Sequence, residues 1–168
     1  MKLKVKDATL IIIAVVIVAV IVIFGFPSQG LTGSTVTATL TIDFAESQAP
    51  AYEGNLTTWT EVDGSWTTST VSNGGHSIWV FENMTSKSNC YEQLMAASAI
   101  GHFPMHVQNQ TLGTFVDNIA GIENQDPGAG WQYYINGIYA NRACNLNAIS
   151  NGDEIIWIYQ LDPFVQGA

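Results

Sequence analysis

Residues 130–160 read GWQYYINGIYANRACNLNAISNGDEIIWIYQ, and this stretch decides the fold because it sets two Asn-Gly pairs among aromatic runs. Asn-Gly tolerates the positive φ angles of a type I′ turn, so Asn136-Gly137 predicts a β-hairpin. Asn151-Gly152 predicts a second turn, which leads into the segment EIIWIYQL. That segment is apolar on both faces, as is typical of a strand in the middle of a sheet.

One helix and several further strands are predicted upstream of this stretch. The segment MTSKSNCYEQLMAASAIG at 84–101 carries Cys90, Leu94 and Ala97 at helical spacing, and Gly101 can end the helix. Three residues can cap its start: Thr85, Ser86 and Ser88. Period-two alternation predicts the strands, at 34–44, 76–83, 105–110 and 114–124.

The stretch at 45–75 is rich in Thr, Ser and Gly and holds Trp59 and Trp66. We expect it to form an elaborated loop or a sheet edge. The whole pattern predicts an α+β fold class, in which one helix packs on a mixed, mostly antiparallel β-sheet of β-grasp-like form.

The N-terminal segment predicts a transmembrane helix before this domain. Lys2, Lys4 and Lys6 precede an uncharged, largely apolar run at 8–26, which would span roughly 28 Å as a helix. Because basic residues mark the cytoplasmic side of a span, we expect a single-pass protein of the cell membrane with its N-terminus inside. A cleaved signal peptide and a processed, pilin-like leader are the alternatives.

The predicted domains follow from this topology. They are a cytoplasmic basic region at 1–7, a transmembrane signal anchor at 8–26, a linker at 27–33 and an extracellular domain at 34–168.

The chain is acidic, with five Lys and Arg against fourteen Asp and Glu and a formal net charge of −9. Of the five Lys and Arg residues, only Lys87 and Arg142 lie beyond the apolar run. Such a surface repels nucleic acid, so no nucleic-acid partner is predicted.

Cys90 and Cys144 are the two cysteines, and both fall in the predicted extracellular part. An even pair in an oxidising compartment predicts a disulfide, with two free thiols as the alternative. Three Asn-x-Thr motifs predict glycosylation on an exported surface: Asn55, Asn83 and Asn109.

The order of these motifs resembles the transcobalamin-like C-terminal domain. The resemblance covers about residues 34–161 and rests on TIDF, SNCYEQLMAAS, FVDNIAGIEN, GWQYYINGIYAN and SNGDEIIWIYQ. It implies the small β-rich module that closes over the corrin ring in vertebrate cobalamin carriers and that also occurs in prokaryotic surface proteins. The long 45–75 insert and Cys144 depart from the family pattern, and the carriers' large helical domain has no counterpart here.

The aromatic residues of this stretch are the candidate ligand-binding residues. Strand alternation puts Trp131, Tyr133 and Ile135 on one face and Gln132 and Tyr134 on the other. These rings can form core and ordinary sheet surface, a binding face for a ring-bearing or glycan ligand, or a docking face for a partner. The candidate set is Trp131, Gln132, Tyr133, Tyr134, Tyr139 and Trp157.

No catalytic motif stands out, so the protein is predicted not to be an enzyme. The three histidines are His76, His102 and His106, and Pro104 between the last two forbids the helix of a zinc-protease site. A weak surface metal site at this pair is the alternative to no metal. There is no phosphate-binding loop and no nucleophile elbow.

The sequence therefore predicts a membrane-anchored, extracellular, non-catalytic binding module. Its partners are expected to be the membrane and either a small-molecule ligand or another surface protein. The resemblance implies a corrinoid of the cobalamin type, or another ring-bearing molecule, as ligand, and no other cofactor. The alternative is a pilin-like surface-assembly or adhesion subunit that interacts through its sheet edges.

Overall fold

Strand β1 (Thr35–Asp43) shows how alternation builds the larger sheet. Its apolar side chains point to one face, and its threonines point to the other. Four side chains on the first face are buried: Val36, Ala38, Leu40 and Ile42. The computed structural model describes residues 34–45, 47, 53–125 and 128–161.

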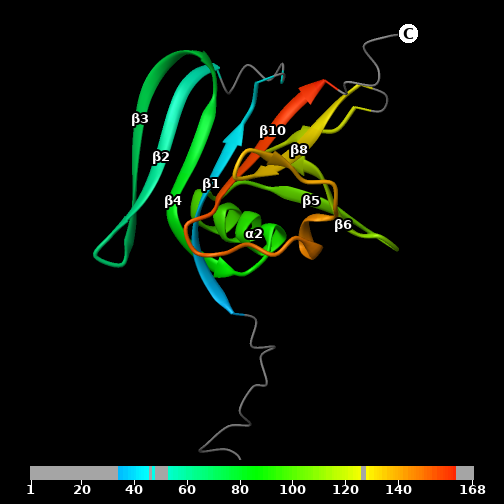
Figure 1. Ribbon diagram of the computed structural model, residues 1–168. Coiled ribbons are helices and arrows are strands. Elements are labelled where there is room, and N and C mark those ends of the chain that lie inside the picture. The colour runs from blue at the N-terminus through cyan, green and yellow to red at the C-terminus, as the bar shows by residue number, and fades with distance from the viewer. Residues whose placement is uncertain (1–33, 46, 48–52, 126–127, 162–168) are drawn as a thin grey trace, which may run out of the picture. The chain divides into compact units, whose positions relative to one another are not determined.

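β1 belongs to a seven-stranded sheet with the order β3-β2-β4-β1-β10-β8-β9 (Figure 1). The β1–β10 and β2–β4 pairs are parallel, and the other neighbouring pairs are antiparallel. The other strands are β2 (Glu53–Val62), β3 (Ser65–His76), β4 (Ile78–Lys87), β8 (Ala129–Ile135), β9 (Ile138–Tyr139) and β10 (Glu154–Leu161).

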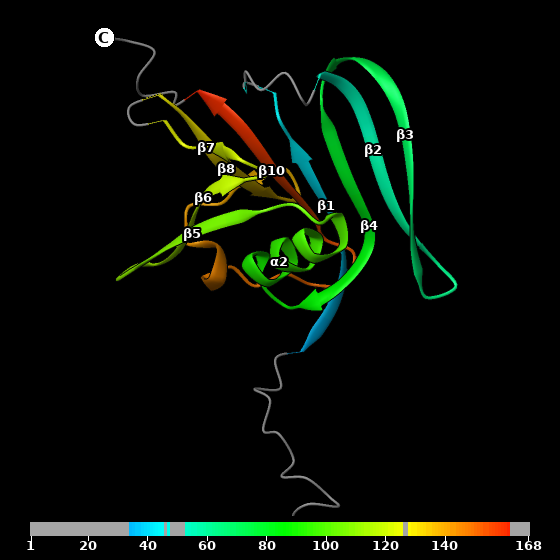
Figure 2. The same ribbon diagram turned by 180° about the vertical axis from the view of Figure 1, so that it is seen from behind.

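A second, three-stranded sheet has the order β5-β6-β7 and lies beside the helix α2 (Figure 2). The helix contacts β4 and β1, and β6 contacts β8, so both elements pack on the larger sheet. These elements are α2 (Cys90–Gly101), β5 (Met105–Gln110), β6 (Gly113–Ile119) and β7 (Ile122–Glu123), with a short 3-10 helix, η2 (Cys144–Leu146), near the end of the chain.

The core lies between the larger sheet and this layer. The strand register aligns Leu40 with Ile155 and Trp157 with Tyr133, so these side chains share one face of the sheet. Leu94 of α2 and Ile119 of β6 are fully buried against that face. The apolar character of β10 is explained by its place between β1 and β8.

The predicted α+β class is wrong, because the described part of the chain is mostly β. The stretch at 45–75, expected to be a loop or a sheet edge, supplies two of the longest strands at one edge of the larger sheet, where β2 pairs in parallel with β4. Its threonines favour this, since β-branched residues suit strands and Thr57 and Thr70 pair across β2 and β3.

The prediction of one mixed, mostly antiparallel sheet is also wrong, because the described part of the chain forms two sheets. The segments at 105–110 and 114–124 form strands, as expected, but they build a separate sheet. The helix therefore shares its layer with a second sheet and does not cover the larger sheet alone.

The helix ends at Gly101 as predicted, but its capping residues differ from the expected ones. Asn89 caps α2 by accepting a hydrogen bond from the Glu92 N–H, in place of the three predicted caps. His102, rather than Gly101, adopts the left-handed conformation that ends the helix, with φ of 54°.

The predicted location in the cell membrane must also be corrected. Within the residues that the structure describes, no helix is both long and apolar enough to cross a bilayer. The run at 8–26, on which the predicted transmembrane helix rests, lies outside the described residues.

Candidate functional site

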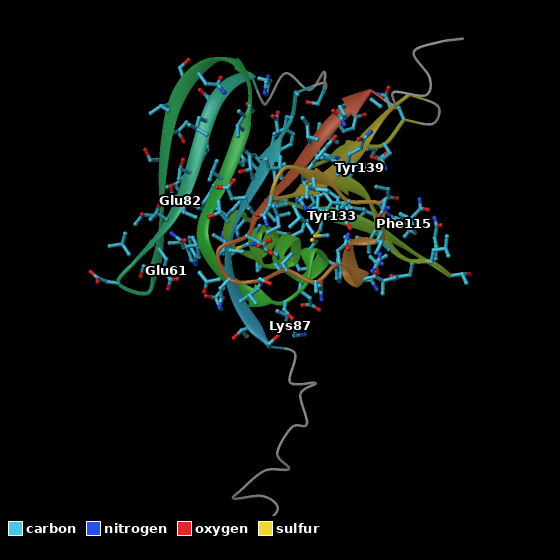
Figure 3. All side chains as sticks on the ribbon, viewed as in Figure 1. Glu61, Glu82, Lys87, Phe115, Tyr133 and Tyr139 are labelled. Carbon is cyan, nitrogen blue, oxygen red and sulfur yellow. The ribbon has the colours of Figure 1, made fainter. Side chains whose placement is uncertain are left out.

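An open groove of about 630 Å³ lies where β6, β8, β10 and the segment at 139–146 meet. Figure 3 labels three residues that line it, Phe115 of β6, Tyr133 of β8 and Tyr139 of β9. No Asp or Glu is among its lining residues, although the chain as a whole is strongly acidic.

One wall of the groove is held to β6 by polar contacts around Thr114. The Thr114 N–H donates to Asn145 Oδ1 at 2.9 Å, and the Cys144 thiol donates to the Thr114 carbonyl at 3.1 Å. These contacts join residues about thirty positions apart in the sequence. They fix the 143–146 turn beside the β5–β6 hairpin.

Gly113 permits this close approach. A Cβ at this position would lie 2.5 Å from the Ala143 Cβ and 2.7 Å from Asn145 Oδ1, which is closer than atoms can pack. The φ of Gly113 is also +119°, a conformation that residues with a Cβ rarely adopt. A glycine is thus required where the β5–β6 hairpin meets the 143–146 turn.

The floor of the groove is aromatic. Tyr133 stacks on Trp157 with ring centroids 4.7 Å apart. The Tyr133 hydroxyl donates to the Arg142 carbonyl at 2.7 Å and accepts a hydrogen bond from Asn147 Nδ2. Burial raises the pKa of Tyr133, so its hydroxyl stays protonated and holds the 142–147 segment down.

Other aromatic side chains use their polar tips to join the two sheets. The Trp131 indole N–H donates to the Ile122 carbonyl at 2.8 Å, and the Tyr159 hydroxyl donates to the Glu123 carbonyl at 2.8 Å. Both acceptors belong to β7. These polar tips have a structural role in the described fold. Of these two residues, only Trp131 lines the groove.

Trp157 has a polar tip without a partner. It is nearly fully buried, and its Nε1 makes no hydrogen bond within the described residues. An unpaired buried donor costs about 1–3 kcal/mol. The Trp157 indole therefore contributes to the floor through its ring, while its N–H is buried without a partner among the described residues.

The six predicted ligand residues do not all face the groove. Trp131, Gln132, Tyr133, Tyr139 and Trp157 line it, whereas Tyr134 does not. Alternation along β8 turns two side chains to the opposite face, where Gln160 Nε2 donates to both Gln132 Oε1 and the Tyr134 hydroxyl. Tyr139 is directly opposite Tyr134 in the β8–β9 register, and their rings are in contact with centroids 5.6 Å apart, so Gln132 and Tyr139 both border the groove through their backbones.

Exposed apolar side chains surround the groove, and none of these was among the residues predicted from the sequence. The exposed fractions are 74% for Leu112, 56% for Leu146 and 39% for Phe115. Arg142 also lines the groove and was missed. The only local signal was that Leu112 and Leu146 interrupt otherwise polar turns, which does not reveal that the two turns meet.

The two cysteines are free thiols in the structure, so it does not contain the predicted disulfide. Both are buried, at the first turn of α2 and in η2, two elements in contact. Burial raises the pKa of Cys90 to about 12 and that of Cys144 to about 11, which makes both thiols poor nucleophiles. The disulfide stays a prediction.

The remaining predicted positions lie away from the groove. Asn55, Asn83 and Asn109 are all exposed, and their glycosylation stays a prediction. His106 pairs with Asp117 at 2.7 Å and His76 with Asp43 at 2.9 Å. Among the described residues, no group of three or more His, Cys, Asp or Glu is placed to hold a metal ion.

Comparisons with known proteins add the following. A family model described as "Domain of unknown function (DUF4430)" matches residues 96–160, which include every strand that lines the groove. No curated protein is significantly similar in sequence.

Two solved structures are similar to this chain, each with a TM-score of 0.46. Haptocorrin in complex with Cbi is 13% identical over 77% of this chain, which spans 26% of haptocorrin. A proposed metal binding protein from Ruminococcus gnavus ATCC 29149 is 12% identical over 76% of this chain and 98% of its own. We draw no functional conclusion from similarities at this level.

Proposed function

We propose that this domain is a non-catalytic binding module that holds a small, largely apolar or ring-bearing ligand in the groove between β6, β8 and the 139–146 segment. The observation that carries this proposal is the group of exposed apolar side chains around one hollow, namely Leu112, Phe115 and Leu146. Exposed apolar groups gathered at one concave site are typical of ligand and partner sites.

The walls of the groove support this function because their positions are fixed before any ligand arrives. Thr114, Asn145 and Tyr133 hold the 142–147 segment through hydrogen bonds. A site that is already formed loses little conformational entropy when its ligand binds.

A corrinoid is the first ligand to test, because the sequence motifs resemble the module that covers the corrin ring in cobalamin carriers. Calorimetric titration of the full-length protein with cobalamin measures this directly. Absence of heat at millimolar cobalamin would exclude a corrinoid as the ligand, and other ring-bearing ligands would remain as candidates.

The groove itself is tested with phenylnaphthylamine, an uncharged dye whose fluorescence rises in apolar sites. We expect Leu146→Asp to weaken dye binding at least tenfold, since it puts a charge on the apolar rim. Val71→Asp is the matched control, because Val71 is 54% exposed but lies on β3 outside the groove. Equal binding by both variants and the wild type would refute the proposal.

Assembly through a sheet edge is a second candidate function, favoured by one observation. β3 is an edge strand of twelve residues, is largely exposed, and carries neither Lys nor Pro. Natural edges are usually protected by such residues, and an unprotected edge can pair with another chain. Sedimentation should show self-association that Val71→Lys abolishes; a monomer at all concentrations would exclude this function.

A further inference from the structure

Arg142 occupies a distinctive place in the groove. It lies in the segment that forms the wall, and its backbone carbonyl is fixed by the Tyr133 hydroxyl at 2.7 Å. The residue itself is exposed, so its guanidinium is accessible from solvent. The main-chain contact anchors the position while the side chain remains free to contact a ligand.

The charges around Arg142 make it unusual in this protein. Among the described residues no carboxylate forms an ion pair with it, and the residues that line the groove include no Asp or Glu. Lys87, the other cation beyond residue 33, pairs with Glu92 at 3.5 Å. Among the described residues, Arg142 is thus a positive charge without an ion pair, in a groove whose lining contains no acidic side chain.

We propose that the ligand of this groove is an amphipathic anion whose acidic group pairs with the Arg142 guanidinium while its apolar body covers the aromatic floor. This inference rests on the proposed function and names the class of ligand. A guanidinium presents a planar array of donors that matches a carboxylate, sulfonate or phosphate with two parallel hydrogen bonds.

The net charge narrows the ligand class further. A chain of formal charge −9 repels anions at long range, so a polyanion would be disfavoured. A ligand with one acidic group can pair with Arg142, and its apolar body can contact Leu146 and Phe115 at the rim. The chemistry therefore fits an aromatic or aliphatic monoacid.

Two dyes with the same ring system test this class of ligand on the full-length protein. Anilinonaphthalene sulfonate carries one acidic group, and phenylnaphthylamine is its uncharged counterpart. We expect Arg142→Gln to weaken sulfonate binding about three- to tenfold, as for a partly exposed ion pair, and to leave phenylnaphthylamine binding unchanged. The sulfonate affinity of Arg142→Lys should lie between those of the wild type and Arg142→Gln, because an ammonium keeps the charge but loses the planar array of donors.

Lys87→Gln is the matched control, since it removes a cation that does not line the groove. Equal sulfonate affinity in wild type and Arg142→Gln would overturn the inference while leaving the proposed function intact, provided that phenylnaphthylamine still binds and is lost in Leu146→Asp. An equal loss of sulfonate affinity in Lys87→Gln would also overturn it, because only net charge would then matter. Thermal unfolding of each variant confirms that it is folded.

Discussion

Tyr133 on β8 and Trp157 on β10 stack face to face, with ring centroids 4.7 Å apart and planes inclined by 24°. The pair is directly opposed in the antiparallel register of the two strands. It forms the floor of the groove on one side, and through the Tyr133 hydroxyl it holds the 142–147 segment. The same two rings therefore belong to both the core and the candidate site.

Tyr133→Phe should destabilise the fold by about 1–2 kcal/mol, because it keeps the stacked ring but leaves the Arg142 carbonyl and the Asn147 amide without their partner. Urea unfolding measures the loss. Tyr134→Phe is the matched control on the opposite face, where the hydroxyl accepts one longer hydrogen bond of 3.1 Å. Equal stability of both variants would show that the hydroxyl does not hold the wall.

Gly113→Ala should cost more stability than Gly121→Ala. Both glycines have positive φ, so both changes introduce backbone strain of about 1 kcal/mol. Only at Gly113 would the new methyl group also collide with Ala143 and Asn145, since nothing lies within 4 Å of a Cβ at Gly121. Thermal unfolding of the two variants measures the difference, and equal midpoints would contradict the described contact between the walls.

Gln93→Leu should stabilise the protein by about 1 kcal/mol. Gln93 of α2 is fully buried, and neither its Nε2 nor its Oε1 has a hydrogen-bond partner in the described part of the chain. Leucine has a similar volume and needs no partner. Urea unfolding measures the gain, with Gln110→Leu on the exposed strand β5 as control; a loss of stability in Gln93→Leu would mean that the amide is satisfied in solution.

The His106–Asp117 pair should make stability depend on pH in the acid range. Burial alone would raise the pKa of Asp117, but hydrogen bonds from Gln108 and His106 outweigh it and lower that pKa below its ordinary value of 3.8. A lowered folded-state pKa gives stability that is present above the unfolded pKa and is lost as pH falls through the folded one.

Asp117→Asn measures this contribution. The variant should be less stable than wild type at pH 6, and the difference should shrink as the pH falls below about 4. Unfolding free energies across this range, with Asp63→Asn as control, provide the measurement. A difference that does not change with pH would show that the carboxylate charge is not involved.

Local sequence signals predicted the elements whose structure is determined by a few neighbouring residues. The Asn136-Gly137 turn has φ angles of 51° and 76°, as a type I′ hairpin requires. The helix and β5 also lie where their patterns indicated. In these elements side-chain periodicity and backbone preference agree, so a short window of sequence suffices.

The features that could not be predicted depend on residues far apart in the chain. Strand β3 has a largely exposed pattern with no clear alternation, and it is a strand because it pairs with β2. The groove exists because the turn before Thr114 meets the turn at Asn145, thirty-one positions later. Neither turn shows this contact locally, and so Leu112, Leu146 and Arg142 were missed as site residues.

Because of the contact at Gly113, the groove forms only when the domain is completely folded. Because its walls come from two segments that meet only in the completed domain, an unfolded or half-assembled chain has no hollow to offer. Any molecule that occupies the groove must then favour the native state, by about 2.7 kcal/mol at a concentration of one hundred times its Kd. A rise in melting temperature could therefore rank unknown compounds without a prior guess at their identity.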